Sequence, residues 1–224
     1  MDHMHTLPTT NATLQTPYIR VTFPVQGSYL PADHGYLLYA AISKTLPHLH
    51  GVSWLGIERI SGIPGDKGMI TLPTSRTSLH LRLPAVNFAD VLPLAGKRLE
   101  IAGHTVRVGP PLSYPLVPAV SLYARIVTIK NFTEPKTFLD AAYRQLTAIG
   151  INATLELPNG VETRYRRIIN IHNKKVVGFS LIAHSMSDQD SITLQNVGLG
   201  GRRKMGCGLF NPIAKARAKK GDAL

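Results

Sequence analysis

A proline-rich stretch in the middle of the chain separates two halves with the same order of expected elements. The 224-residue sequence places Pro110, Pro111, Pro115 and Pro118 there, a composition typical of an extended linker. On each side, hydrophobic periodicity and turn residues predict strand, helix, strand, strand, helix, strand. This is the order of the split βαβ unit. The sequence therefore predicts an α+β fold of two tandem ferredoxin-like (βαββαβ) domains.

The first half opens on a strand, because residues 18–25, YIRVTFPV, alternate and are rich in β-formers. Asp33 is expected to cap a helix that runs to about Leu46. Apolar residues at helical spacing predict its buried face, which is Leu37, Leu38, Ala41, Ile42 and Thr45. Further elements are expected as strands over 52–61, 69–72, 78–83, 98–101 and 104–108 and a helix over 87–94.

The second half repeats this outline. Its expected elements are a strand over 121–130, a helix over 134–149, a hairpin of 164–172 and 175–184, a helix over 187–194 and a last strand over 208–213. The hairpin turns about Asn173, and the second helix begins with a capping-type SDQD segment. The expected division is a disordered leader over 1–16, an N-terminal domain over 17–112, a linker over 113–118, a C-terminal domain over 119–214 and a basic tail over 215–224.

The charge of the chain favours a polyanionic partner. The formal net charge is +12, and such an excess of Lys and Arg promotes phosphate contacts with counterion release. Nucleic acid is favoured over an acidic membrane surface, because no clear basic amphipathic helix occurs outside the tail. The single cysteine, Cys207, excludes an intramolecular disulfide and a zinc site built from several cysteines. A reducing, cytoplasmic setting is therefore expected.

Residues 196–212 form a glycine-rich basic segment, NVGLGGRRKMGCGLFNP. Its glycines are Gly198, Gly200, Gly201, Gly206 and Gly208, and its basic triplet is Arg202, Arg203 and Lys204. Glycine permits positive φ, and successive exposed amides can face an anion. A nucleotide-triphosphate loop is excluded, because Cys207 and Gly208 stand where Lys and Ser or Thr are required. Two interpretations stay open, a flexible surface loop with solvated charge and a clamp for a polyanion.

The histidines offer one candidate for acid–base chemistry and little for a metal. No His-Glu-x-x-His pair occurs, and His48 and His50 lack a third ligand, so no metal site is expected. His34 lies at the start of the first helix, where a neutral imidazole could accept a proton beside a phosphate. It could equally pack under the helix start. Tyr36 and Tyr39 are expected on the other side of the helix, as stacking residues or as half-buried surface residues.

Three segments together carry a family resemblance. They are FPVQG, LPADHGYLLYAAIS and the C-terminal GLGGRRKMGCGLF. The combined pattern resembles the CRISPR repeat-processing endoribonucleases of the RAMP superfamily. The LPxDHGY start looks like the subfamily found with cyanobacterial and myxobacterial type I systems. The resemblance covers both halves of the chain in order, and the glycine segment is its more specific part.

The resemblance implies a metal-independent enzyme without a cofactor. Such proteins have two ferredoxin-like domains of RAMP type and bind the repeat of the CRISPR precursor transcript, often as a stem-loop. A histidine in or near the first helix assists attack of a ribose 2′-hydroxyl on the adjacent phosphate. The products are a 2′,3′-cyclic phosphate and a 5′-hydroxyl. Further expected partners are other subunits of a type I effector complex, and no membrane is expected.

The resemblance also assigns roles to residues of this chain. His34 matches the catalytic histidine by position, and His50, in PHLHG, is the alternative. Tyr36 or Lys44 would assist the charge of the transition state. The glycine segment with Arg202, Arg203 and Lys204 would grip RNA, and the expected contacts to stem phosphates are Arg164, Arg166 and Arg167. The competing functions are a non-catalytic RAMP-type RNA-binding subunit of a CRISPR effector complex and a general basic RNA-binding protein.

Overall fold

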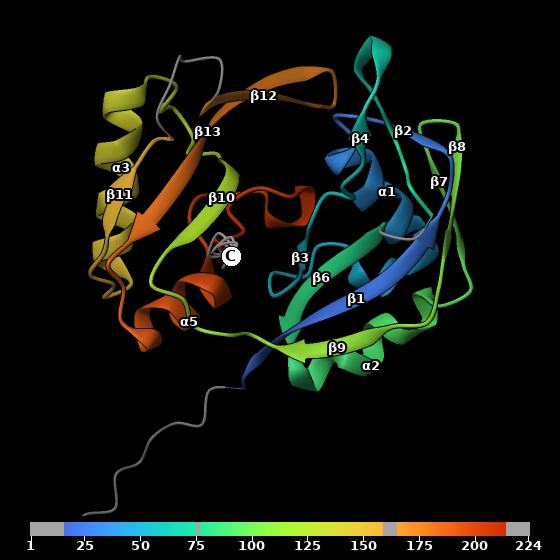
Figure 1. Cartoon of the computed structure of the whole chain (residues 1–224), viewed down its shortest axis with the longest axis horizontal. Helices are drawn as coiled ribbons and strands as arrows, with labels where there is room; N and C mark the ends of the chain where they lie inside the picture. Colours follow the sequence, from blue (N-terminus) through green and yellow to red (C-terminus); the bar gives the residue numbers. More distant parts are fainter. Residues whose placement is uncertain (1–15, 75–76, 159–164, 214–224) are drawn as a thin grey trace, which may run out of the picture.

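The computed structural model describes residues 16–74, 77–158 and 165–213. The expected leader over 1–16, except its last residue, the basic tail from 215 and Arg164 therefore lie outside the described residues. The two halves of the chain lie side by side, and the segment that follows helix α5 (Asp188–Val197), drawn in red, passes between them (Figure 1).

Strand β1 (Tyr18–Gln26) is the centre of the N-terminal sheet. The other strands of the sheet are β3 (Gly56–Ile57), β6 (Ser78–Pro84), β7 (Arg98–Ile101), β8 (His104–Val108) and β9 (Leu112–Pro115). Their order is β3-β6-β1-β8-β7, with β9 also paired to β1 and all pairs antiparallel. The predicted alternation is confirmed, because Val21, Phe23 and Val25 are buried in the core.

The N-terminal core is closed by helix α1 (Gly35–Thr45) and by α2 (Phe88–Val91), which lies between two 3₁₀ turns. A small separate sheet consists of β2 (Tyr29–Pro31), β4 (Ile63–Pro64) and β5 (Met69–Thr71). Short 3₁₀ turns also occur at Pro47–Leu49 and Asp66–Gly68. The helix expected over 87–94 is confirmed in outline. Residues 88–91 are helical, and Pro93 lies in the 3₁₀ turn that follows them.

The C-terminal half has the same topology. Its elements are β10 (Leu122–Val127), α3 (Pro135–Ala148), β11 (Thr154–Glu156), β12 (Arg166–Ile171), β13 (Lys174–His184), α5 and β14 (Asn211–Pro212). The sheet order is β11-β13-β10-β14, with β12 paired to β13. The predicted hairpin is confirmed and turns at His172 and Asn173, both with positive φ. Ser187 caps α5 as predicted, because its side chain accepts a hydrogen bond from the Asp190 amide.

The start of α1 differs from the prediction. His34 is the residue before the helix, and no side chain caps it. The Asp33 carboxylate instead accepts hydrogen bonds from the backbone amide and side chain of Asn170, at 2.7 and 3.0 Å. The buried face is also rotated, because Leu37 is exposed while Tyr39 is buried. This rotation follows from tertiary packing, since the C-terminal half covers Tyr39 with the Lys204 ammonium, 5.4 Å from the ring centre.

Three stretches of backbone also differ from the prediction. Only residues 56–57 of the expected strand 52–61 are extended in a sheet, and only 211–212 of 208–213. Residues 112–115 overlap the expected linker, yet they form β9 and pair with β1. A proline-rich segment can do this at the rim of a sheet, where Pro needs no donor on its outer side. The expected domain limits otherwise stay a prediction.

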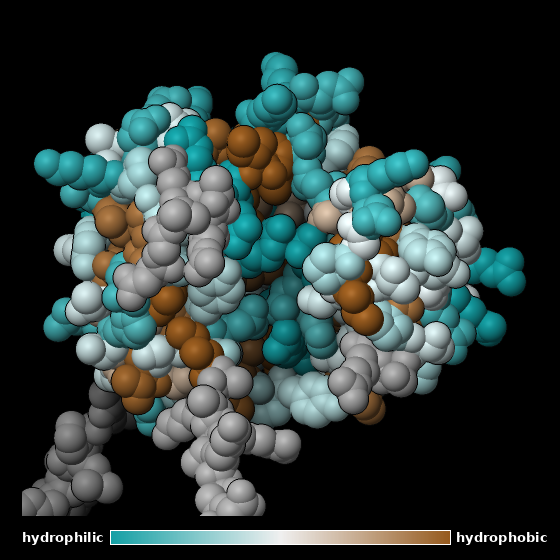
Figure 2. Space-filling model, turned by 45° about the horizontal axis from the view of Figure 1, so that its top comes forward, coloured by the Kyte–Doolittle hydropathy of each residue, from teal (hydrophilic) through white to brown (hydrophobic). Residues whose placement is uncertain are grey.

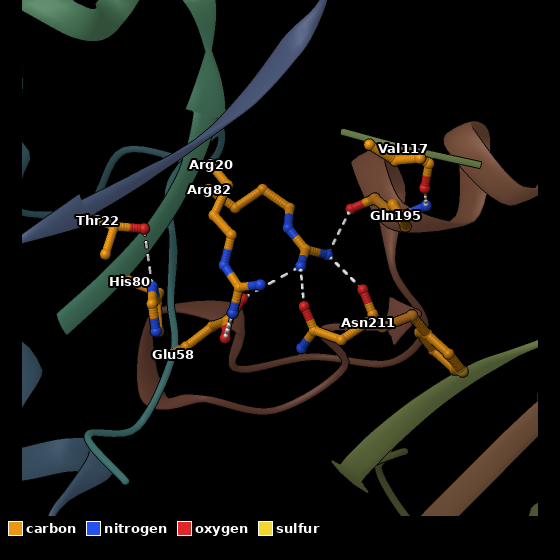
Figure 3. Close-up of polar contacts among 9 residues, drawn as sticks. Arg20, Thr22, Glu58, His80, Arg82, Val117, Gln195 and Asn211 are labelled. Atoms are coloured by element: carbon orange, nitrogen blue, oxygen red, sulfur yellow. Dashed lines mark hydrogen bonds and ion pairs between the residues drawn. The ribbon is translucent and has the colours of Figure 1, made fainter. Parts of the chain in front are cut away.

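Arg82 on β6 joins the two halves through its buried guanidinium (Figure 3). It donates to the backbone oxygens of Gln195 and Phe210, at 3.0 and 2.7 Å. It also donates to the Asn211 side chain at 2.7 Å and to Glu58 at 3.1 Å. Burial lowers the pKa of Arg82 to about 10, so the group is charged at neutral pH. Its hydrogen bonds fix the last strand of the chain against the N-terminal sheet.

Replacing Arg82 with Met should destabilise the protein strongly. The change leaves two buried carbonyls and the Asn211 amide oxygen without their donor, and breaking one side of such a network costs roughly 3–5 kcal/mol. Urea unfolding measures the free energy of unfolding. The matched control is Arg98→Met on β7, where the side chain is exposed and a change of no more than about 0.5 kcal/mol is expected. Equal stabilities of the two variants would contradict the assignment.

Candidate active site and nucleic-acid interface

The glycine segment is a compact loop whose backbone folds back on itself. Gly198, Gly200, Gly206 and Gly208 all have positive φ. A Cβ on Gly208 would lie 2.1 Å from the carbonyl oxygen of Leu199, and a Cβ on Gly198 would lie 2.2 Å from that of Gly208. Positive φ and this backbone contact together require glycine at both positions. The loop is therefore packed, and the interpretation as a flexible surface loop is wrong.

The amides of this loop are used inside the protein. Gly200 donates to the Gln145 side chain at 2.8 Å, and Gly201 donates to Thr128 at 3.0 Å. Gly208 donates to the Ile126 carbonyl at 2.8 Å. These amides are not available to an anion, so the expected cradle of exposed amides is wrong at these positions.

The three basic residues of the loop have different surroundings. Arg202 is exposed, and its guanidinium reaches Thr128 Oγ1 at 3.4 Å. Arg203 is half-buried with its guanidinium 6.0 Å from the Tyr18 ring centre, and burial lowers its pKa. Lys204 donates to the Val52 carbonyl at 2.9 Å. Arg203 and Lys204 therefore attach the loop to the N-terminal half, and Arg202 faces solvent.

His34 is buried, and both of its ring nitrogens have backbone partners. Nδ1 lies 2.6 Å from the Pro31 carbonyl oxygen, which requires Nδ1–H as the donor, and Nε2 accepts from the Ile60 amide at 3.1 Å. The residue is 0% exposed, and burial lowers its pKa to about 4. The imidazole is therefore neutral and has no lone pair left for a substrate proton. The expected catalytic role of His34 is not supported, and the alternative of packing under the helix start is what the structure shows.

His50 is the exposed histidine beside the glycine loop. Its Nδ1 lies 3.3 Å from the Tyr39 hydroxyl, and the two rings stack at 5.9 Å with 12° between their planes. The Lys204 ammonium lies 5.4 Å from the centre of the same Tyr39 ring. The Gly51 amide also donates to the Tyr39 hydroxyl at 3.3 Å. Tyr39 thereby brings an accessible imidazole and a cation from opposite ends of the chain to one place.

A second pair joins α1 to the hairpin of the C-terminal half. The Tyr36 hydroxyl lies 3.2 Å from His172 Nδ1, and the two ring centres are 4.5 Å apart. With the Asp33–Asn170 hydrogen bonds, this contact fixes the hairpin tip against the start of α1. A cavity of about 360 Å³ lies between these two elements. The Tyr36–His172 and Asp33–Asn170 pairs therefore line a cavity at the junction of the two halves.

The family model described as Cas6 Crispr matches residues 19–215. The CRISPR-associated endonuclease Cas6 of Myxococcus xanthus (strain DK1622) is 42% identical over 199 residues, which cover 89% of this chain and 83% of that protein. The chain belongs to the Cas6 family of CRISPR-associated endonucleases. The family resemblance predicted from the sequence is thus confirmed.

Solved structures of Cas6 and RAMP proteins share the fold. A Cas6-related protein from Pyrococcus furiosus has a TM-score of 0.64 at 13% identity and covers 89% of this chain and 100% of its own. A RAMP protein described as binding different RNA substrates has a TM-score of 0.62 at 14% identity, with 87% and 99% covered. At such identities the likeness concerns the fold alone, and it confirms the predicted tandem ferredoxin-like architecture.

In this Cas6-family chain, the sequence did not indicate the contacts of two site residues, Tyr39 and His172. The sequence predicts Tyr39 on the outer side of its helix with Tyr36, whereas its contact with His50 depends on the turn after α1. His172 lies far along the chain from Tyr36, and local spacing carries no signal of their contact. Lys44 is exposed near the end of α1 and, among the described residues, forms no hydrogen bond or ion pair with either pair.

Two of the three hairpin arginines that the sequence predicts as RNA contacts, Arg166 and Arg167, lie on β12, and Arg164 lies outside the described residues. Arg167 donates through Nε to the Ser180 hydroxyl at 3.2 Å, and Arg166 is half-buried. Across the described ranges, no three His, Cys, Asp or Glu side chains are placed to hold a metal ion. In the same part of the chain, every helix is too short or too polar to cross a bilayer.

The buried imidazole of His34 should make stability depend on pH. Its pKa is lowered from 6.5 to about 4 by burial, so the fold favours the neutral form. The contribution is complete above about pH 6.5 and is lost as pH falls through 4, by about 3 kcal/mol in all. Urea unfolding of the wild type and of His34→Gln, repeated between pH 7.5 and 4, measures it. The stability difference between the two should shrink on acidification, and a constant difference would contradict the prediction.

Proposed function

We propose that this chain is a metal-independent endoribonuclease that binds the CRISPR precursor transcript and cleaves within each repeat. The ribose 2′-oxygen attacks the adjacent phosphorus, and the bond from phosphorus to the 5′-oxygen breaks. The proton of the 2′-hydroxyl passes to a base, and the 5′-oxygen takes up a proton. The products are a 2′,3′-cyclic phosphate and a 5′-hydroxyl, from which mature CRISPR RNA follows. The observation that carries the proposal is the group of His50, Tyr39 and Lys204.

His50 is proposed as the residue that transfers protons. When its Nδ1–H donates to the Tyr39 hydroxyl, the lone pair lies on Nε2, for which the described residues provide no hydrogen-bond partner. An exposed imidazole with a free ring nitrogen suits a general base. Tyr39 orients the ring by stacking and through its hydroxyl, so the direction of Nε2 is set. His50 was the alternative to His34 on sequence grounds, and the structure supports it through access and contacts.

Cations near this group are proposed to hold the RNA. Lys204 lies beside Tyr39 and can neutralise charge that develops on the phosphate. Arg202 is exposed on the same loop, and Arg166 and Arg167 lie on the hairpin strand β12. The glycines of the loop contribute by shaping the backbone that carries Arg202 and Lys204. Other subunits of a type I effector complex are proposed as further partners on the family resemblance alone.

Replacing His50 with Ala should slow cleavage at least 100-fold while RNA binding persists, because general acid–base catalysis contributes 10²–10⁴-fold. The measurement is the single-turnover rate on labelled repeat RNA in EDTA, with affinity measured in parallel. The matched control is His48→Ala in the same PHLH segment, whose ring contacts the Asp90 carbonyl instead, and it should cleave at the wild-type rate. Binding without cleavage in the wild type would favour the non-catalytic RNA-binding subunit.

A single 2′-deoxy nucleotide on the 5′ side of the cut should abolish cleavage. The substitution removes the attacking hydroxyl and leaves the phosphate and the base in place. Binding is expected to stay within about twofold of the unmodified RNA, because one hydroxyl contributes only a modest share of the contacts. Gel analysis of the modified and unmodified repeat measures both effects. Cleavage of the modified RNA at the same bond would refute attack by the 2′-hydroxyl.

A further inference from the structure

Three arginines from the two halves approach one another in the cleft between them. Arg59 follows β3 in the N-terminal half, while Arg125 lies on β10 and Arg167 on β12. The Ser180 hydroxyl links the last two, because it accepts from Arg167 Nε at 3.2 Å and donates to the Arg125 carbonyl at 2.7 Å. The face shown in Figure 2 is hollowed and largely hydrophilic between the two halves.

A cavity of about 160 Å³ lies at this cluster. Arg59 and Arg125 line it from opposite halves, and Tyr123 and Gly206 of the glycine loop also line its wall. Pockets that enclose whole small-molecule ligands measure about 300–1,000 Å³. A cavity of this size suits one phosphate group and a part of the nucleotide attached to it, and it excludes a double helix.

The protein supplies few partners for these guanidinium groups. Arg59 Nε is buried without a hydrogen bond, although its Nη1 donates to the Ala32 carbonyl. No side chain or carbonyl in the described ranges bonds the Arg125 guanidinium, and no carboxylate there forms an ion pair with Arg59, Arg125 or Arg167. Unpaired buried donors of this kind are costly unless an acceptor reaches them.

The nearby carboxylates are already engaged. Glu58, on the cavity wall, binds Arg20 at 2.7 Å and Arg82 at 3.1 Å. The Asp33 carboxylate accepts a hydrogen bond from Asn170. Its charge raises the pKa of Arg59 without a direct ion pair. The pKa of Arg59 is lowered to about 10, chiefly by burial and in part by the charges of Arg125 and Arg167, while Asp33 acts in the opposite direction. The pKa of Arg125 is lowered by burial and by Arg167. The fold thus holds like charges together, and no carboxylate of the described residues forms a direct ion pair with them.

We propose that Arg59 and Arg125, with Arg167 beside them, bind one phosphodiester group of a single-stranded stretch of RNA. The identification of the anion as RNA rests on the proposed function, whereas the anion site itself rests on the three arginines and the cavity. Guanidinium groups from two halves give a phosphate two-sided, charge-assisted hydrogen bonds. The Tyr123 ring on the cavity wall offers a stacking surface for the adjoining base. RNA bound there would hold the two halves together.

Arg125→Gln tests the site, with Arg98→Gln on the exposed strand β7 as the charge-matched control. The probe is fluorescein-labelled repeat RNA, titrated at several salt concentrations. Arg125→Gln should weaken binding about tenfold and make the slope of log affinity against log salt shallower by about 0.7, as expected for one lost single-strand phosphate contact. Arg98→Gln should leave both unchanged. Wild-type affinity and slope in Arg125→Gln would overturn the site.

Inorganic phosphate provides a readout that does not depend on RNA recognition. At constant ionic strength it should raise the Tm of the wild type and of Arg98→Gln, and raise that of Arg125→Gln less. Without phosphate, Arg125→Gln should unfold at the wild-type Tm or above it, because a repelling charge is removed. A lower Tm with an undiminished phosphate response would show a structural arginine and overturn the site.

The two proposals fail in different ways. A wild-type protein that responds to phosphate through Arg125 but does not cut repeat RNA would refute the proposed function and leave the anion site standing. Normal cutting with undiminished affinity in Arg125→Gln would refute the site alone. Arg125→Lys keeps the charge and should recover part of the affinity, which separates loss of charge from local misfolding.

Discussion

The junction of the two halves depends on close contact between the backbone at the start of α1 and the backbone of the glycine loop. A Cβ on Gly35, at the start of α1, would lie 2.4 Å from the Met205 carbonyl oxygen. The glycine of LPADHGY and the C-terminal glycine loop are therefore in direct contact. The two sequence motifs that carry the family resemblance form one interface, and each leaves room for the other. Any side chain at Gly35 would push the loop away from α1 and carry Lys204 away from Tyr39.

The many cations of the chain divide into two kinds by their surroundings. Arg82 and Lys204 donate to carbonyl groups across the junction, so their desolvation is offset by short hydrogen bonds. Arg59 and Arg125 face a cavity with few such partners. Composition counts both kinds as positive charge, although the first kind also serves to hold the two halves together. A net charge of +12 therefore overstates the surface that is free to bind RNA.

Local patterns predicted most of the fold because the elements that they describe are locally determined. Strand alternation located β1, and the capping serine Ser187 located the start of α5. The prediction failed where a distant partner decides the structure. β9 is a strand because β1 presents an open edge to a proline-rich segment. The amides of the glycine loop are occupied because Thr128 and Ile126 lie beneath them, which no spacing within the loop reveals.

The same reasoning separates the two histidines of the candidate site. His34 has the position that the motif favours, yet its Nε2 accepts from the Ile60 amide, next to Arg59. The imidazole thereby fixes the segment that carries Arg59 and Glu58 against the start of α1. We expect a change at His34 to disturb both the proposed anion site and the junction, and to lower cleavage through them. His50 does not hold a buried segment in place in this way, because it is exposed and contacts Tyr39 at the surface. A His50 variant that loses cleavage but keeps its stability and RNA binding would therefore identify His50 as a catalytic residue. The same loss in a His34 variant would identify a positioning role.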